Sequence, residues 1–300
     1  MACDWIVVGI DALTDYYDIN LKNVRQKFLC EHPNYHNHEG LIQDTELLNK
    51  ICSDHKPNII IHLAAQAGVR YSIENPKSYV ESNLMGTFHI LEIARKYKPD
   101  HLLMASTSSV YGSLKDYPLH ESQKCDTPMS FYAATKLSNE AMAHSYSHLY
   151  EIPVTMLRFF TVYGPWGRPD MALFKFTKSI LEDKCIDVYN NGKHTRDFTY
   201  IDDIVEGLIK TLDNPPTRNL NWDSNSPNPA TSKDPWCIFN IGNSKQVQLM
   251  DYINAIEKTL GKKAKINFLP LQPGDVPNTF SDTTILRKKF NYIPKTSVID

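Results

Sequence analysis

Short runs of apolar residues alternate with longer amphipathic stretches through the first half of the chain. Four runs are rich in branched residues and bounded by polar or turn-forming residues, which predicts buried strands at Trp5–Ile10, Ile59–Ala64, Leu102–Ser106 and Val154–Phe159. Apolar residues at helical spacing predict amphipathic helices at Ser78–Tyr97 and Tyr132–Tyr150. Strands that alternate with helices favour a parallel sheet with right-handed crossovers. We therefore expect a Rossmann-like, doubly wound α/β fold.

The pattern changes after about residue 165, where Pro, Gly and Asn become frequent and strands such as Cys185–Tyr189 are short and isolated. We predict one doubly wound domain over residues 1–164 and a smaller α/β ligand-binding region over residues 165–300. Within the second part, residues 193–213 are expected to return to the first domain. The polar, Pro-rich segment Asn214–Pro235 predicts a surface loop.

Charge and composition exclude several classes of protein. The 300 residues are 42% hydrophobic and 22% charged with a formal net charge of −2, so no basic surface for nucleic acid or a membrane is expected. The six cysteines are scattered, which favours reduced thiols. No apolar run approaches the roughly 20 residues of a membrane span, and nothing resembles a signal peptide. These features predict a cytoplasmic protein without nucleic-acid or membrane partners.

Candidate chemistry begins with Tyr132-Ala-Ala-Thr-Lys136, which places a phenol and an ammonium on one face of a helix. A phenol with a pKa of about 10 is a poor base at neutral pH, and a neighbouring cation lowers that pKa. Taken alone, the spacing is better explained by a solvated helix face. His32, His36 and His38 lie in a loop without Cys or carboxylate at metal spacing, so no metal site is expected.

The ends of the predicted strands carry further candidates. Thr107, Ser108 and Ser109 follow one strand, and hydroxyls at the carboxyl end of a parallel strand face the ligand crevice. The segment Ile61–Gly68 ends another strand in small residues that allow a cofactor to approach closely. Asp11 ends the first strand, where an acidic residue can bind ribose hydroxyls or simply form a turn. The sequence contains no Gly-x-Gly-x-x-Gly or Gly-x-x-Gly-x-x-Gly turn for a pyrophosphate.

Together these motifs resemble the extended short-chain dehydrogenase/reductase family. The resemblance is carried by the order of HLAA at residues 62–65, STSSVYG at 106–112, the Tyr132/Lys136 pair and RDFTYIDD at 196–203. Residues 15–18, 65–72 and above all 157–178 are similar to the UDP-glucuronate 4-epimerase branch. The resemblance covers nearly the whole chain. Relatives begin with a strand and Gly-rich loop that this chain lacks, and end with a further helix, so we expect a first domain without its first strand.

The resemblance implies bound NAD, a UDP-sugar substrate and a homodimer that pairs through the helices Ser78–Tyr97 and Tyr132–Tyr150. It implies that Thr107, Tyr132 and Lys136 are catalytic. The residues expected to contact NAD are Asp11, Leu63, Ala64, Ala65, Tyr132, Lys136 and Phe159. The residues expected to contact the UDP-sugar are Ser108, Ser109, Thr161, Arg168, Val188, Tyr189, Arg196 and Asp275.

Two features narrow the expected reaction. Related 4,6-dehydratases have Asp-Glu directly after the catalytic Thr, and related decarboxylases have a Glu nearby. In this sequence Ser108 and Ser109 occupy the positions after Thr107. Hydroxyls at these positions favour simple 4-epimerisation. Arg168 suits a sugar carboxylate, although a surface arginine in a Pro-rich turn is the plainer explanation. UDP-glucuronate is the expected substrate, with UDP-glucose or UDP-N-acetylglucosamine as alternatives. A catalytically weak or inactive nucleotide-sugar-binding protein is the other alternative, because the Gly-rich loop is missing.

Overall fold

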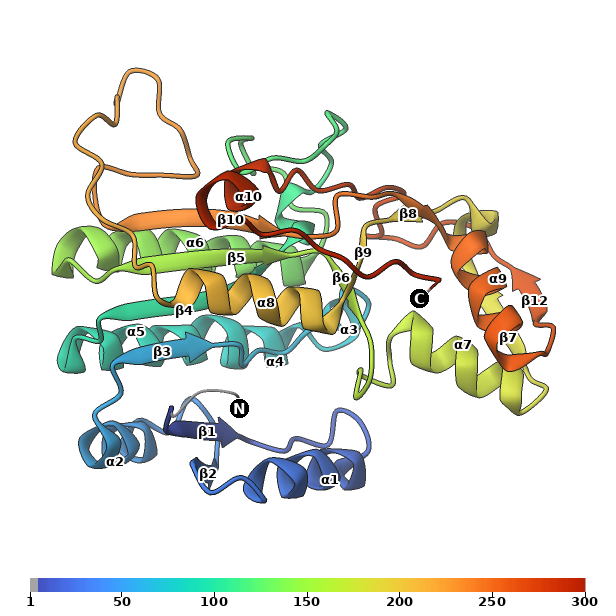
Figure 1. The fold of residues 1–300 in the computed structure, drawn as a ribbon, viewed down its shortest axis with the longest axis horizontal. Helices are drawn as coiled ribbons and strands as arrows, with labels where there is room; N and C mark the ends of the chain where they lie inside the picture. The colour runs from blue at the N-terminus through green and yellow to red at the C-terminus, as the bar shows by residue number, and fades with distance from the viewer. Residues whose placement is uncertain (1–4, 300) are drawn as a thin grey trace.

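The computed structural model describes residues 5–299, and its centre is a four-stranded parallel sheet (Figure 1). The strand order is β10-β5-β4-β3, with bounds Trp236–Ile241, Val154–Phe159, His101–Thr107 and Ile59–His62. The sheet is buried on both faces, because alternate apolar residues of each strand point to opposite sides. The predicted α/β fold with a parallel sheet is confirmed.

Helices cover both faces of this sheet. On one face, α2 (Thr45–His55), α5 (Gly86–Tyr97) and α6 (Phe131–Tyr150) share a core with Leu102 and Met104 of β4. On the other face, α8 (Ile201–Leu212) and α10 (Thr284–Phe290) share a second core with Leu103. Residues 236–241 also lie in the central sheet, where β10 pairs with β5.

A second parallel sheet lies near the N-terminus and contains β1 (Val7–Asp11) and β2 (Tyr35–Glu39). Helix α1 (Ile19–Cys30) connects the two strands. Within residues 5–299, no hydrogen-bonded ladder joins β1 to β3. Ile10 of β1 and Ile60 of β3 nevertheless pack against the same hydrophobic cluster. The two sheets are therefore joined by side-chain packing, and β1 and β3 each keep one edge without a partner strand in the described chain.

The predicted helix Ser78–Tyr97 is divided into α4 (Pro76–Tyr79), a π-helical segment (Val80–Met85) and α5. The side chain of Asn83, which is fully buried, explains the wider turn. It donates to the Gln66 carbonyl at 3.0 Å and to Thr135 Oγ1 at 3.0 Å, and accepts from the Gln66 amide at 2.8 Å. The irregular turn thus ties the loop after β3 to α6, which regular helical spacing does not reveal.

The C-terminal region is built from short strand pairs and two packed helices (Figure 1). The pairs are β6 (Thr161–Tyr163) with β9 (Phe198–Tyr200), β7 (Cys185–Val188) with β12 (Lys265–Phe268), and β8 (Thr195–Arg196) with β11 (Val247–Gln248). The helices α7 (Ala172–Leu181) and α9 (Leu249–Leu260) pack on a third core. Shorter elements are α3 (Tyr71–Glu74) and the 3-10 turns Ser108–Tyr111 and Tyr189–Gly192.

The predicted loop Asn214–Pro235 forms no helix or strand, only one isolated bridge at Thr231, and it projects from the body of the protein in Figure 1. Across the described residues, no helix has both the length and the apolar character needed to cross a bilayer.

Candidate active site

A cavity of about 1440 Å³ lies at the carboxyl ends of β3, β4 and β5 and extends toward the C-terminal region. Pockets for one small molecule are usually about 300–1,000 Å³, so this cavity has room for two ligands. Most of the residues predicted for the site line it. They are Leu63, Ala65, Thr107, Ser108, Ser109, Tyr132, Lys136, Phe159, Thr161, Arg168, Tyr189, Arg196 and Asp275.

Helix α6 carries the predicted catalytic pair into the cavity. Ser130 caps the helix by accepting a hydrogen bond from the Ala133 amide at 3.1 Å, so Tyr132 lies in the first turn. Lys136 lies one turn later, is almost fully buried, and donates from Nζ to the Ala105 carbonyl of β4 at 2.9 Å. Burial lowers the pKa of Lys136 to about 8, although the nearby Glu140 acts in the opposite direction.

The surroundings of Tyr132 act on its phenol in opposite directions. Burial raises the pKa of Tyr132, while a side-chain hydrogen bond with Thr107 and the positive charge of Arg168 lower it. Thr107 is itself fixed, because its Oγ1 donates to Ser109 Oγ at 3.2 Å and accepts from the Ser109 amide at 3.2 Å. Thr107 and Ser109 thus form a hydrogen-bonded pair of hydroxyls beside the Tyr132 phenol at one wall of the cavity.

A buried ion pair lies beneath this wall. The Arg158 guanidinium of β5 donates to both carboxylate oxygens of Glu140 in α6, from Nε at 2.9 Å and from Nη2 at 2.8 Å. Ser106 of β4 donates to the same carboxylate at 2.5 Å, and the guanidinium lies 4.8 Å from the Tyr111 ring centroid. Bidentate geometry fixes α6 against β4 and β5, the strands that present Thr107 and Phe159 to the cavity.

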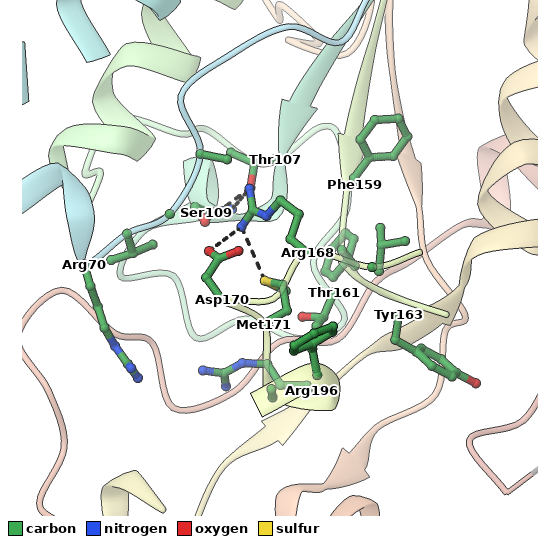
Figure 2. A pocket seen from close by; sticks show the side chains of 18 of the residues that line it. Arg70, Thr107, Ser109, Phe159, Thr161, Tyr163, Arg168, Asp170, Met171 and Arg196 are labelled. Atoms are coloured by element: carbon green, nitrogen blue, oxygen red, sulfur yellow. Dashed lines mark hydrogen bonds and ion pairs between the residues drawn. The ribbon is translucent and has the colours of Figure 1, made fainter. Parts of the chain in front are cut away.

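Arg168 lies on the loop between β6 and α7, on the same side of the cavity as Thr107 and Ser109 (Figure 2). Its Nη2 donates to Asp170 Oδ2 at 3.0 Å and to Met171 Sδ at 3.4 Å. Tyr16, from the segment between β1 and α1, donates to the same Asp170 oxygen at 3.2 Å. A planar guanidinium held beside a row of hydroxyls can bind a carboxylate through two N–H groups.

Arginines gather at the far end of the cavity. Arg196 donates from Nη1 to the carbonyls of Thr195 and Pro277, at 3.0 and 2.9 Å. The Arg70 guanidinium lies 4.4 Å from the Tyr189 ring centroid and 3.8 Å from Asp275 Oδ2. Burial, followed by the Arg196 charge, lowers the pKa of the neighbouring His194 to about 4. With His194 neutral, the Arg70 and Arg196 guanidinium groups are cations that can bind an anion at this end of the cavity.

Three residues predicted for the site lie outside the cavity lining. The exposed Asp11 ends β1, and its side chain accepts from the Leu13 amide at 2.8 Å, as a turn residue does. Ala64 is half-buried beside the lining residues Leu63 and Ala65. Val188 is fully buried in the core of the C-terminal region and does not reach the cavity surface.

Many lining residues were not singled out by the sequence motifs. Four of them have polar side chains that take part in the contacts above: Tyr16, Arg70, Asp170 and His194. Tyr16 and Arg70 stand in the stretches 15–18 and 65–72 that carry the family resemblance, and Asp170 stands in 157–178. Their individual roles depend on contacts between distant segments. No group of three or more His, Cys, Asp or Glu among residues 5–299 has an arrangement suited to a metal ion.

Comparison with known sequences gives one family and several relatives. The family described as GDP-mannose 4,6 dehydratase matches residues 2–300. Protein CapI of Staphylococcus aureus is 48% identical over 294 residues, covering 98% of this chain and 88% of CapI. The probable UDP-glucuronate 4-epimerase of Rhizobium meliloti (strain 1021) is 45% identical over 293 residues, covering 97% of this chain and 86% of the relative.

Comparison with solved structures agrees with the sequence relatives. The UDP-glucuronic acid 4-epimerase of Bacillus cereus, crystallised with UDP-glucuronic acid and NAD, matches with a TM-score of 0.87 and 35% sequence identity. The match covers 98% of this chain and 87% of the crystallised chain. The similarity extends over both the central sheet and the C-terminal region.

Proposed function

The chain belongs to the GDP-mannose 4,6-dehydratase family of NAD-dependent epimerases and dehydratases, and from this premise we propose that it interconverts UDP-glucuronate and UDP-galacturonate. One observation carries the proposal. The cavity holds the Tyr132–Thr107 pair beside Ser108 and Ser109, and Arg168 lies on the same side. The UDP-glucuronate 4-epimerases among the relatives support the same substrate.

In the proposed mechanism, Tyr132 removes the proton from the C4 hydroxyl of the sugar, and Thr107 shares this proton through its hydrogen bond with the phenol. The nearby positive charge of Arg168 stabilises the phenolate. When bound, NAD supplies reversible hydride transfer at C4, through which the 4-keto sugar can be reduced on its opposite face. Tyr132 then returns the proton to the new C4 hydroxyl.

The residues around Lys136 fit the nicotinamide ribose of NAD. The Lys136 ammonium is almost fully buried, and the Ala105 carbonyl is its one hydrogen-bond acceptor among the described residues. An ammonium has three N–H donors, so two remain for ribose hydroxyls. Phe159 and the small residue Ala65 also line the cavity. These residues would hold the cofactor at the reacting end of the sugar.

Epimerisation is favoured over water elimination or decarboxylation by the residues that follow Thr107. Removing a proton from C5 requires a base beside that carbon, and Ser108 and Ser109 provide hydroxyls there. These hydroxyls and Thr161 can hydrogen-bond a sugar carboxylate without repelling it. At the other end, Arg196 and Arg70 are proposed to bind the diphosphate.

Turnover of defined UDP-sugars tests the proposal. Purified protein is incubated with NAD and UDP-glucuronate, UDP-glucose or UDP-N-acetylglucosamine, and the products are separated by anion-exchange chromatography. We expect UDP-galacturonate from UDP-glucuronate and little or no product from the two neutral sugars. Turnover of a neutral sugar alone would reassign the substrate, and a 4-keto-6-deoxy or decarboxylated product would reassign the reaction.

A second candidate function is nucleotide-sugar binding with weak or no catalysis. It is favoured by the absence of a hydrogen-bonded ladder between β1 and β3 among the described residues. Isothermal titration with NAD separates the two functions. Binding of NAD supports the epimerase, whereas tight binding of UDP-glucuronate without any binding of NAD would support the second candidate.

We also propose a homodimer that pairs through α5, the π-helical segment before it, and α6. Large apolar side chains are exposed on these elements, with exposed fractions of 46% at Met85, 40% at Phe88 and 62% at Leu149. Sedimentation equilibrium should give twice the chain mass, and Phe88→Glu should give the monomer.

The cysteines are unpaired within the described residues, which supports the predicted cytoplasmic location.

A further inference from the structure

The loop that carries Arg168 contacts the N-terminal sheet unit, which we define as β1, α1, β2 and the segments between them. The Phe28 ring of α1 stacks on Trp166 with centroids 6.4 Å apart and an interplanar angle of 24°. Arg25 of the same helix donates from Nη2 to the Gly167 carbonyl at 2.8 Å. Two successive loop residues are therefore held by one helix, which reduces the freedom of the loop on which Arg168 depends.

A third contact reaches the ion pair itself. Asp170 Oδ2 accepts from Arg168 Nη2 at 3.0 Å and from Tyr16 OH at 3.2 Å (Figure 2 shows the Arg168–Asp170 contact). Tyr16 is fixed in turn, because its ring centroid lies 4.8 Å from that of Tyr71. The phenol stays protonated as a donor, since burial and the Asp170 charge raise the pKa of Tyr16 to about 12.

The ion pair leaves part of Arg168 available to a ligand. Both hydrogen bonds from the Arg168 guanidinium to described residues start from Nη2, so Nε and Nη1 remain as donors. Asp170 Oδ1 is shielded from solvent and has no hydrogen-bond partner among residues 5–299. Both side chains line the cavity and are only partly exposed, 31% for Arg168 and 25% for Asp170. A surface ion pair in a mobile turn would lack these features.

The charge of Asp170 also matters for an acidic substrate. A carboxylate that enters the cavity meets both the positive Arg168 and the negative Asp170, so net attraction by charge alone is weak. Recognition then depends on whether the free N–H groups of Arg168 are aligned with the incoming carboxylate. Alignment of this kind requires one edge of the guanidinium to be fixed.

We propose that Asp170, fixed by Tyr16, is a positioning residue that holds the Nη2 edge of Arg168 so that its remaining N–H groups receive the sugar carboxylate. The inference rests on the proposed function, in which the substrate is an acidic UDP-sugar. It gives Asp170 and Tyr16 a role in selecting an acidic over a neutral sugar, in addition to shaping the loop.

The test compares Asp170→Asn, Asp170→Glu and Tyr16→Phe with the wild-type protein, using steady-state turnover of UDP-glucuronate and the Kd of UDP. For Asp170→Asn we expect kcat/KM to fall about 10- to 100-fold, because misplacement of a binding group by about 1 Å can cost 10²-fold. Tyr16→Phe should lower kcat/KM by a smaller factor, and Asp170→Glu should recover part of the loss. The Kd of UDP should stay within about threefold, since UDP lacks the carboxylate. Matched controls are Asp213→Asn and Tyr150→Phe, which lie outside the cavity lining.

Two results would overturn the inference while the proposed function stands. One is an active Asp170→Asn protein with wild-type kcat/KM for UDP-glucuronate. The other is a fall in affinity for UDP as large as the fall in kcat/KM for UDP-glucuronate, which would mean that Asp170 only shapes the loop. A wild-type protein that neither binds nor converts UDP-glucuronate would contradict the proposed function, and this inference with it.

Discussion

The pKa of the Tyr132 phenol lies above its ordinary value, because burial outweighs the two interactions that favour the phenolate. Burial disfavours the phenolate, and the Thr107 hydrogen bond and the Arg168 charge favour it. Lys136 donates its hydrogen bond to the Ala105 carbonyl, and among the described residues it makes none with the phenol. Among the described residues the cation that lowers the pKa of Tyr132 is therefore Arg168, the residue for which the sequence suggested a contact with the substrate carboxylate.

Removing the phenolic oxygen should abolish turnover and leave the fold intact. Tyr132→Phe is expected to lower kcat for UDP-glucuronate by about 10²- to 10⁴-fold, because the group that exchanges the C4 proton is lost. Tyr150→Phe, at the exposed end of the same helix, is the matched control and should keep wild-type kcat. Chromatographic rate measurements decide the matter, and a Tyr132→Phe protein with near wild-type kcat would contradict the assigned role.

Burial of Lys136 should make the protein less stable than it would be without this charge. The folded-state pKa is lowered from 10.5 to about 8, so below pH 8 the folded state carries the full cost of a buried ammonium. Between these values the unfolded state binds more protons, and the free energy of unfolding therefore rises with pH. Lys136→Met should raise the free energy of unfolding near pH 7 by up to roughly 3 kcal/mol.

Urea unfolding at two pH values checks this prediction. The stability gain of Lys136→Met over wild type should be largest near pH 7 and should shrink toward pH 10. A loss of stability at pH 7, or an equal gain at both pH values, would show that burial of the ammonium is not the dominant effect.

At the scale of elements, the position of α6 depends on the buried pair between Glu140 and Arg158. Glu140→Leu should leave the Arg158 guanidinium buried and unpaired, which lowers the free energy of unfolding by about 3–5 kcal/mol. The double variant Glu140→Leu/Arg158→Met removes both charges and should lose clearly less than Glu140→Leu alone. Urea titrations of the wild type and both variants measure the difference. An equal loss in the single and double variants would show that packing, rather than the unpaired charge, dominates.

The sequence predicted the regular elements well and the irregular ones poorly. The strand Val154–Phe159 was predicted with its observed bounds, and the helix of Tyr132 begins one residue earlier than expected, because apolar period and capping are local properties. The π-helical segment Val80–Met85 and the place of β10 in the central sheet were missed. Both depend on partners distant in sequence, such as Gln66 and Thr135 for the Asn83 side chain.

The same distinction holds for the candidate site. The strand-end rule predicted that Thr107 faces the crevice, and helical spacing predicted that Tyr132 and Lys136 share one helix face. The family resemblance implied that the three act together, and all three line one cavity. The contact between Tyr16 and Asp170 joins residues 154 positions apart, and no local pattern marks it. Asp11 was predicted from its place at a strand end, but it lies at the end of β1, which does not pair with the central sheet in the described chain.

At the scale of the whole molecule, the cavity is assembled from three parts of the chain. The central sheet and α6 supply the acid–base residues, the C-terminal region supplies Arg196 and Asp275, and the N-terminal sheet unit supplies Tyr16. The N-terminal unit is joined to the rest by packing of Ile10 and Ile60 on a shared core and by its contacts with the Arg168 loop. Loosening this unit should therefore affect the sugar end of the cavity.

The central claim is that the chain inverts C4 of UDP-glucuronate without exchanging the hydrogen on that carbon. The most direct measurement uses UDP-glucuronate with deuterium at C4, incubated with NAD and the protein, and follows the product by proton NMR and mass spectrometry. The account predicts UDP-galacturonate that keeps the deuterium at C4. Product that has lost the label to solvent, or no UDP-galacturonate at all under conditions where NAD is bound, would contradict it.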